Sequence, residues 1–159
     1  MWSSDETIFK KYNDTYLFDL FFSGVVRKEQ HDNIRFKIFE RLHELNDFKV
    51  NVHTAFYEKN KLKGQLYTQS TTEYAKTISN SKIALTTTGP SDLVGTRYFE
   101  IMASNKALIL CNKMSQHVYK GIFVDSHNCV MFEDVDDFFY KFKYYISNEE
   151  ERLKIVHNA

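Results

Sequence analysis

The sequence contains only two cysteines, Cys111 and Cys129, among its 159 residues. Two cysteines in separate apolar runs do not make the disulfide framework of a small secreted domain. We therefore interpret them as buried free thiols, a common state of cysteine in the core of a protein from a reducing compartment. The segment from Met1 to Lys11 is polar and lacks the apolar stretch of a signal peptide, so we expect a cytoplasmic protein.

Net charge and long apolar runs are also absent. The 21 basic and 21 acidic residues cancel, and no cluster of basic residues would attract nucleic acid or an anionic membrane. No apolar stretch approaches the roughly 18 residues that a transmembrane helix needs. The sequence therefore predicts a soluble protein with no nucleic-acid partner and no transmembrane segment.

Two common catalytic patterns are missing as well. The six histidines are scattered, and no two of them stand one helical turn apart beside acidic residues, as in common zinc motifs. Ser23-Gly24 and Ser91-Asp92 do not lie within the G-x-S-x-G turn that exposes a nucleophilic serine. We therefore expect neither metal ligands nor Ser-His-Asp catalysis.

The sequence does contain a regular alternation of apolar runs and helical patterns. Hydrophobic residues make up 43% of the chain and aromatic residues 16%, a composition typical of a folded domain. Short apolar runs predict strands, and apolar residues spaced three and four apart predict helices. The expected strands are 16–22, 48–52, 82–85, 107–111 and 128–132, and the expected helices are 34–45, 71–79, 96–104, 135–146 and 148–156.

This alternation predicts an α/β fold, namely a Rossmann-like, mainly parallel sheet flanked by helices on both faces. We expect one domain over residues 16–159, an N-terminal extension over 1–15, and a polar surface excursion over 58–65. Ligands of such sheets bind in the loops that follow the carboxyl ends of the strands. The expected loops begin at Ser23, His53, Thr86, Asn112 and Glu133.

The clearest chemical signal lies just after the predicted strand 82–85. A loop that ends at Gly95 leads into a helix whose first turn holds Thr96 and Arg97. The free N–H groups at a helix start attract anions, and an arginine adds a fork of donors that fits phosphate. Glu100, about one turn further, can accept two hydroxyl groups of a ribose, as acidic residues do in dinucleotide sites. This segment therefore predicts a site for a phosphate and a ribose.

The same segment carries a family resemblance. The run Arg97-Tyr-Phe-Glu-Ile-Met-Ala-Ser-Asn-Lys-Ala107 resembles the R-x-F-E-x-x-A-x-G signature of the spore-maturation-type glycosyltransferase-like family. It also resembles the E-x-A-x-x-x-P segment of the larger retaining GT-B group, glycosyltransferase group 1. The order of strands and helices extends the resemblance over roughly Leu17 to Asn158. Asn105 stands where the family has glycine, and asparagine tolerates a left-handed backbone better than most residues.

The resemblance implies the donor-binding, C-terminal half of a hexosyltransferase, which transfers a sugar from a nucleoside-diphosphate sugar to an acceptor. It implies that Glu100 holds the donor ribose and that Gly95, Thr96 and Arg97 lie near the diphosphate. Asp92 stands seven residues before Glu100 in the spacing of two acidic residues of the group, which implies a position near the sugar. Asp92 and Arg97 are accordingly the expected catalytic residues.

The start of the domain adds further candidates. The run from Phe18 to Gly24 is similar to the first strand and glycine turn of the family's donor domain. In that family a basic residue approaches the phosphates after this turn, which implies a role for Arg27 or Lys28. Because basic side chains and a helix dipole would stabilise the diphosphate leaving group, the resemblance implies no metal and no other cofactor.

A GT-B enzyme has a second, acceptor-binding domain, which the resemblance places in the parent chain or in another protein. The alternative function is a non-catalytic, degenerate Rossmann-like module that serves protein interaction. A phosphoacceptor receiver domain is a second alternative, favoured by Thr86–Thr88 and Lys113. Against the receiver, the first strand does not end in an acidic pair that would hold Mg²⁺.

Overall fold

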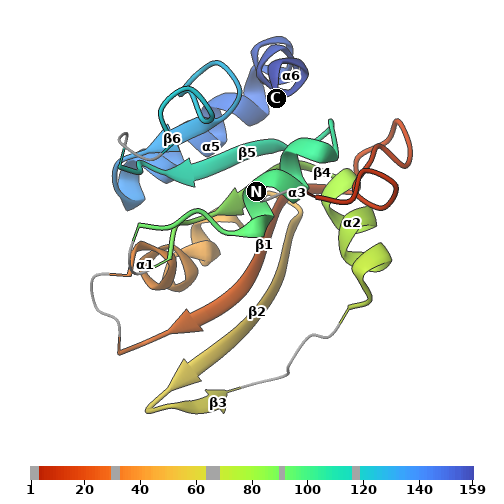
Figure 1. The fold of residues 1–159 in the computed structure, drawn as a ribbon. Helices are drawn as coiled ribbons and strands as arrows, with labels where there is room; N and C mark the ends of the chain where they lie inside the picture. The colour runs from red at the N-terminus through yellow and green to blue at the C-terminus, as the bar shows by residue number, and fades with distance from the viewer. Residues whose placement is uncertain (1–3, 30–32, 64–68, 90–91, 116–118) are drawn as a thin grey trace.

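The computed structural model describes residues 4–29, 33–63, 69–89, 92–115 and 119–159 (Figure 1). The strands are β1 (Phe18–Arg27), β2 (Val50–Glu58), β3 (Lys61–Lys63), β4 (Ser81–Thr86), β5 (Leu108–Asn112) and β6 (Val130–Phe132). The helices are α1 (Ile34–Glu40), the 3₁₀ helix η1 (Leu42–Leu45), α2 (Thr71–Ser79), α3 (Thr96–Ala103), α5 (Val135–Ser147) and α6 (Glu149–Asn158).

The strands form one sheet in the order β3-β2-β1-β4-β5-β6. All neighbouring pairs are parallel except β2 and β3, which form an antiparallel hairpin. Without the antiparallel hairpin strand β3, the five parallel strands have the doubly wound order 2-1-3-4-5, which receiver domains share. The predicted α/β fold with a mainly parallel sheet is therefore confirmed, and the strand order alone does not separate it from a receiver domain.

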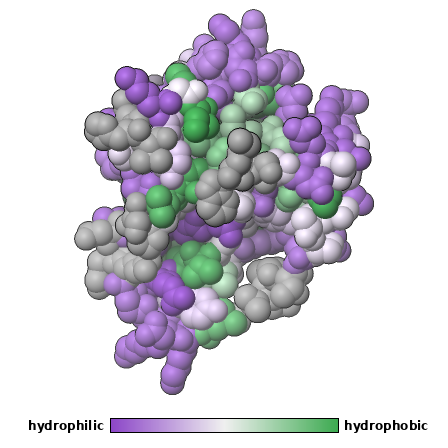
Figure 2. All heavy atoms as spheres, in the orientation of Figure 1, coloured by the Kyte–Doolittle hydropathy of each residue, from purple (hydrophilic) through white to green (hydrophobic). Residues whose placement is uncertain are grey.

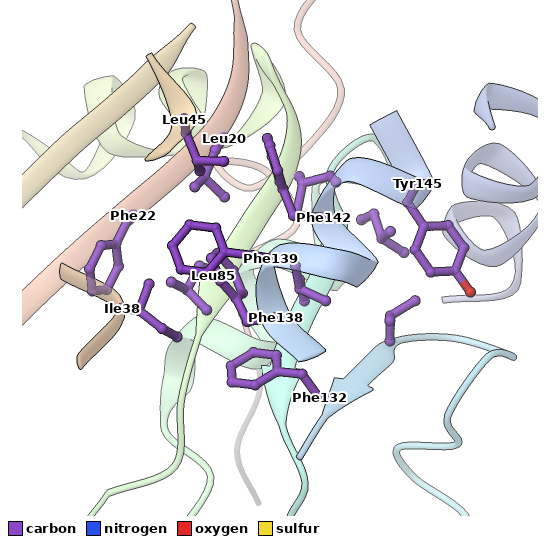
Figure 3. Packing of buried hydrophobic residues seen from close by; sticks show 14 of the residues in the cluster. Leu20, Phe22, Ile38, Leu45, Leu85, Phe132, Phe138, Phe139, Phe142 and Tyr145 are labelled. Carbon is purple, nitrogen blue, oxygen red and sulfur yellow. The ribbon is translucent and has the colours of Figure 1, made fainter. Parts of the chain in front are cut away.

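The first face of the sheet carries the larger core cluster. Leu20, Phe22 and Leu85 point from β1 and β4 toward α1 and α5 (Figure 3). The aromatic side chains of α5, which stand at helical spacing, fill the centre of this layer and are buried: Phe138, Phe139, Phe142 and Tyr145. Because these large side chains pack against α1 as well as the strands, they fix the position of α1 over the sheet.

The second face is covered by α2, α3 and the N-terminal segment. Phe21 and Ile109 of the sheet pack with Ile78 of α2 and Tyr98 of α3, and Phe9 is buried in the same cluster. The predicted free, buried thiols of the two cysteines are confirmed here. Helices thus lie on both faces, while Figure 2 shows hydrophilic residues over α6 and over the tip of the β2–β3 hairpin.

The first strand is longer than expected. The predicted turn at Ser23-Gly24 is wrong, because β1 continues through Gly24 to Arg27. The predicted loop at His53 is also wrong, since β2 runs on to Glu58, paired with β1 as far as Arg27 and Tyr57. Gly24 takes φ +118° inside the strand, and the side chains of Arg35 and Arg97 lie close to its backbone. This glycine therefore allows an unusual strand conformation and a close side-chain contact, and it does not form a turn.

Other departures are smaller. The expected helix 34–45 is divided, since α1 ends at Glu40 and the 3₁₀ helix η1 follows. Residues 58–63 of the expected surface excursion form the β2–β3 hairpin, with Lys59 and Asn60 at positive φ, and residues 64 and 65 lie outside the described residues. Two residues at positive φ are typical of a tight hairpin turn, which explains why this polar segment is ordered.

Just beyond the end of α3, Asn105 has a left-handed backbone conformation whose energetic cost can be tested by substitution. Its φ is +47° and its side chain is exposed. We expect Asn105→Ala to lower the free energy of unfolding by about 1 kcal/mol, because alanine lacks the short polar side chain that helps asparagine to adopt the left-handed conformation. Asn105→Gly should stay within about 0.5 kcal/mol of the parent, because glycine adopts it freely. Equilibrium urea unfolding measures both, and equal losses in the two variants would contradict the backbone explanation.

Candidate functional site

The carboxyl half of β1 has a neighbouring strand on one side only. Its pairing with β4 ends at Phe22 and Leu85, whereas its pairing with β2 continues to Arg27. The connection after β1 passes to α1 on one face of the sheet, and the connection after β4 passes to α3 on the other. This is the topological switch point of the sheet, where the ligands of open α/β sheets bind.

Two cavities open at this switch point. The first, of about 490 Å³, is lined by Gly24, His53, Tyr74, Thr96 and Glu100, among others. The second, of about 930 Å³, reaches from the same loops toward the end of β1 and the start of α1. Four residues line both cavities: Val25, Thr87, Gly95 and Arg97. The Arg97 side chain therefore stands on the wall that the two cavities share.

Arg35 is a buried cation in the second cavity, with 7% of its surface exposed. Its Nε and Nη2 donate to Oγ1 of Thr87 at 3.0 and 2.8 Å, and its Nη1 donates to the carbonyl oxygen of Ser23 at 3.2 Å. These acceptors are neutral, and no described carboxylate forms an ion pair with Arg35. Burial, followed by the positive charge of Arg97, lowers the pKa of Arg35 to about 10.

The guanidinium groups of Arg35 and Arg97 converge on the backbone of Gly24. A β-carbon at Gly24 would lie 2.4 Å from Nη1 of Arg35 and 2.8 Å from Nη1 of Arg97. The positive φ requires glycine here, and a β-carbon would also displace the ends of the two arginine side chains. Two like charges that meet with no described carboxylate between them form a site that a bound anion would stabilise.

The start of α3 points to the same place. Gly95 is the N-cap of α3 and offers no side chain, so no side-chain acceptor caps the first N–H groups of the helix. Gly95 and Arg97 line both cavities, and Thr96 lines the first. The helix start therefore adds free N–H donors and a positive dipole to the two arginines.

Glu100 places a half-buried carboxyl group in the first cavity. Burial raises its pKa, and this effect is opposed by a hydrogen bond with Thr96, the charge of Arg97 and a hydrogen bond with Tyr74. Tyr74 is held by edge-on packing against Phe9, with ring centroids 6.1 Å apart. The first cavity thus combines a carboxyl group, which accepts hydrogen bonds from hydroxyls, with a phenol and a guanidinium that donate them.

The remaining sequence candidates lie further out. Arg27 lines the second cavity, and its guanidinium lies over the ring of Tyr57, 4.8 Å from the centroid. Lys28 lines neither cavity and forms an exposed ion pair with Glu58 at 2.6 Å. Asp92 also lines neither cavity, and its carboxylate accepts a hydrogen bond from the backbone N–H of Ser115. The structure therefore brings together Gly24, Gly95, Thr96, Arg97 and Glu100, with Arg27 in the adjoining cavity.

Sequence reasoning missed Arg35 and Tyr74. Arg35 lies in the first turn of the helix after β1, and Asn33 caps that turn by accepting from the Arg35 backbone N–H. A basic residue in the first turn of a helix that begins at the carboxyl edge of the sheet was an available signal. No comparable signal marks Tyr74, because it stands at an ordinary helical core spacing.

Two further findings concern the part of the chain that the structure describes. It contains no group of three or more His, Cys, Asp or Glu side chains placed to share a metal ion. None of its helices has the length and apolar character needed to cross a bilayer. Lys113, which favoured the receiver alternative, forms an exposed ion pair with Glu133 at 2.7 Å.

Comparison with known proteins extends these observations. Residues 35–159 match the sequence profile of the family described as "Glycosyl transferase-like". The fold is similar to that of the C-terminal domain of a glycosyl transferase group 1 family protein (LpcC) from Francisella tularensis. The TM-score is 0.67 at 14% sequence identity, over 98% of this chain and 94% of that chain. The search of curated proteins finds no match.

The proximity of the two arginines predicts an unusual stability effect. Arg97→Gln should raise the free energy of unfolding of the unliganded protein, because it removes a repulsion with the buried Arg35. We expect less than about 1 kcal/mol, since Arg97 is partly solvated, and the gain should shrink with added salt. Urea unfolding at low and high salt measures it, with Lys28→Gln as the control outside the cavities. A loss of stability in Arg97→Gln would contradict the repulsion.

The burial of Glu100 predicts a pH dependence. Because its pKa is raised in the folded protein, the folded state binds more protons than the unfolded state above the ordinary value of 4.5. The Glu100 contribution is therefore most favourable in acid and is lost as pH rises through the raised pKa. Glu100→Gln has no such titration, so its stability relative to the parent should increase from about pH 4 to about pH 7.5. Urea unfolding across this range tests the sign, and a difference that is constant or reversed would disprove it.

Proposed function

Because the chain belongs to the glycosyl transferase-like family, we propose that it is the donor-binding half of a GT-B glycosyltransferase, which binds a nucleoside-diphosphate sugar. One observation carries this proposal. The buried Arg35 and the neighbouring Arg97 converge on Gly24 with no described carboxylate between them. A diphosphate supplies the negative charge that this arrangement lacks.

The diphosphate would lie at Gly24, between the two arginines and the start of α3. In the transfer step, the bond from the sugar to the terminal phosphate oxygen breaks, and a hydroxyl oxygen of the acceptor bonds to the sugar as its proton passes to the departing phosphate. Negative charge then grows on the departing nucleoside diphosphate. Arg35, Arg97 and the free N–H groups of α3 stabilise that charge, so we expect donor binding to need no metal and no other cofactor.

The nucleoside would occupy the first cavity. The ionised carboxylate of Glu100 accepts hydrogen bonds from the ribose hydroxyls, and Tyr74 and His53 line the remainder of the cavity beside it. The sugar then extends past Arg97 into the second cavity, because Arg97 borders both. Lys28 and Asp92 line neither cavity, so this arrangement gives them no direct contact with the donor.

The acceptor would bind on a second domain, in the parent chain or in another protein. Both cavities lie at the carboxyl ends of the central strands, and the exposed apolar side chains of Val25 and Leu93 line the second cavity. Exposed apolar side chains beside a binding site are suited to contact with another domain. The alternative, a degenerate interaction module, offers no reason for a buried arginine that has no counter-ion among the described residues.

Nucleotide binding separates the two proposals. Thermal unfolding with UDP, GDP, ADP and their sugar conjugates should give a selective rise in Tm with one base, since a ligand of the native state stabilises it. Arg35→Gln, Arg97→Gln and Glu100→Gln should each weaken binding, by roughly 1.5–3 kcal/mol for a lost charged hydrogen bond. Lys28→Gln should bind normally, and EDTA should have no effect.

The contrary result is equally clear. If no nucleotide at millimolar concentration changes the Tm of the parent protein, the donor site is absent and the interaction module becomes the preferred function. If nucleotides bind equally well to the parent, Arg35→Gln and Arg97→Gln, the diphosphate lies elsewhere. Isothermal titration supplies the dissociation constants for each variant, so that a change in protein stability is not mistaken for a change in affinity.

A further inference from the structure

The five arginines of the chain fall into two groups. Arg41 and Arg152 form ion pairs with carboxylates away from the cavities. Arg27, Arg35 and Arg97 form no ion pair with any described residue, and all three line the second cavity. The unpaired arginines are thus concentrated at one place in the fold.

Only one carboxylate stands among the described residues that line this cavity. Glu29 accepts a hydrogen bond from the backbone N–H of Lys59, at the turn between β2 and β3. That hydrogen bond is the main reason why the pKa of Glu29 is lowered, and Arg27 contributes least among the causes. Glu29 is therefore engaged by the hairpin, and the described residues that line the cavity keep an excess of positive charge.

Arg27 lies apart from the other two arginines. It stands three residues beyond Gly24 on β1, which places their Cα atoms roughly 10 Å apart at the rise of an extended strand. A diphosphate bound between Arg35 and Arg97 at Gly24 therefore leaves Arg27 about one sugar ring further along the cavity.

The Arg27 guanidinium is held in a defined orientation. Tyr57 is its register partner on β2, and the guanidinium lies over the Tyr57 ring at 4.8 Å. No described residue accepts a hydrogen bond from this guanidinium. Stacking uses the flat face of the group and leaves the N–H donors at its edge free to bind a carboxylate or phosphate side-on.

We propose that the second cavity binds a further anionic group, distinct from the diphosphate, through Arg27. The group is a carboxylate or phosphate, carried either by the transferred sugar or by the acceptor. The charge of the diphosphate is met by Arg35 and Arg97, so Arg27 is the cation that remains for it. This inference rests on the proposed function and narrows its substrate class from any hexose to one that brings a negative charge to this end of the cavity.

Titration calorimetry of the parent, Arg27→Gln and Lys28→Gln tests the donor as the source of the anion. The ligands are the hexose and hexuronate conjugates of whichever nucleoside diphosphate binds, for example UDP-glucose and UDP-glucuronate. We expect the parent to bind the hexuronate about tenfold more tightly, the scale of one charged hydrogen bond. Arg27→Gln should lose this preference yet keep its affinity for the nucleoside diphosphate alone, and Lys28→Gln should match the parent.

A second titration tests the acceptor as the source. Glucose 6-phosphate and glucose are added to the parent and to Arg27→Gln, with saturating nucleoside diphosphate and without any nucleotide. If the parent binds glucose 6-phosphate but not glucose, and Arg27→Gln binds neither, the anion is assigned to the acceptor. If neither the hexuronate nor glucose 6-phosphate is preferred, or if Arg27→Gln binds both as the parent does, the proposal is overturned. If the parent protein binds glucose 6-phosphate through Arg27 but binds no nucleotide, only the proposed function is overturned.

Discussion

The buried guanidinium of Arg35, bound by neutral oxygens and placed beside Arg97, is the constraint on which the site depends. A buried cation without a counter-ion opposes folding, so the rest of the domain must offset it. The aromatic layer under α5 does this, because it packs α1 against the sheet and carries Arg35 with it. The packing energy of that core thereby offsets the cost of burying Arg35, so the site for an anion is formed before the anion binds.

The strand topology makes the convergence of the two arginines possible. Arg35 reaches the site from α1 on one face of the sheet, and Arg97 reaches it from α3 on the other. Helices on opposite faces approach each other only where the connections diverge, between β1 and β4. Gly24 completes the arrangement, because any side chain at this point of β1 would overlap both guanidinium groups.

The sequence allowed the α/β class, most strands and helices, and the grouping of Gly95, Thr96, Arg97 and Glu100 to be predicted, because these features follow from local patterns. It did not reveal Arg35, whose importance comes from burial and from a neighbour 62 positions away in the chain. Gly24 was misinterpreted for a related reason. Glycine in a short apolar run is most often a turn, and only the approach of two side chains from distant helices explains it within a strand.

The net charge of the chain and the local charge at the cavity lead to different conclusions about whether the protein binds an anion. The net charge of zero argued against a polyanion, yet three of the five arginines line one cavity. A long polyanion requires positive charge spread over an extended surface, whereas lysines such as Lys28 and Lys113 are neutralised here by nearby carboxylates. Unpaired positive charge confined to a cavity within a neutral surface, screened over about 10 Å by physiological salt, favours a small anion that fits inside. The distribution of ion pairs, more than the total charge, therefore points to a compact phosphate-bearing ligand.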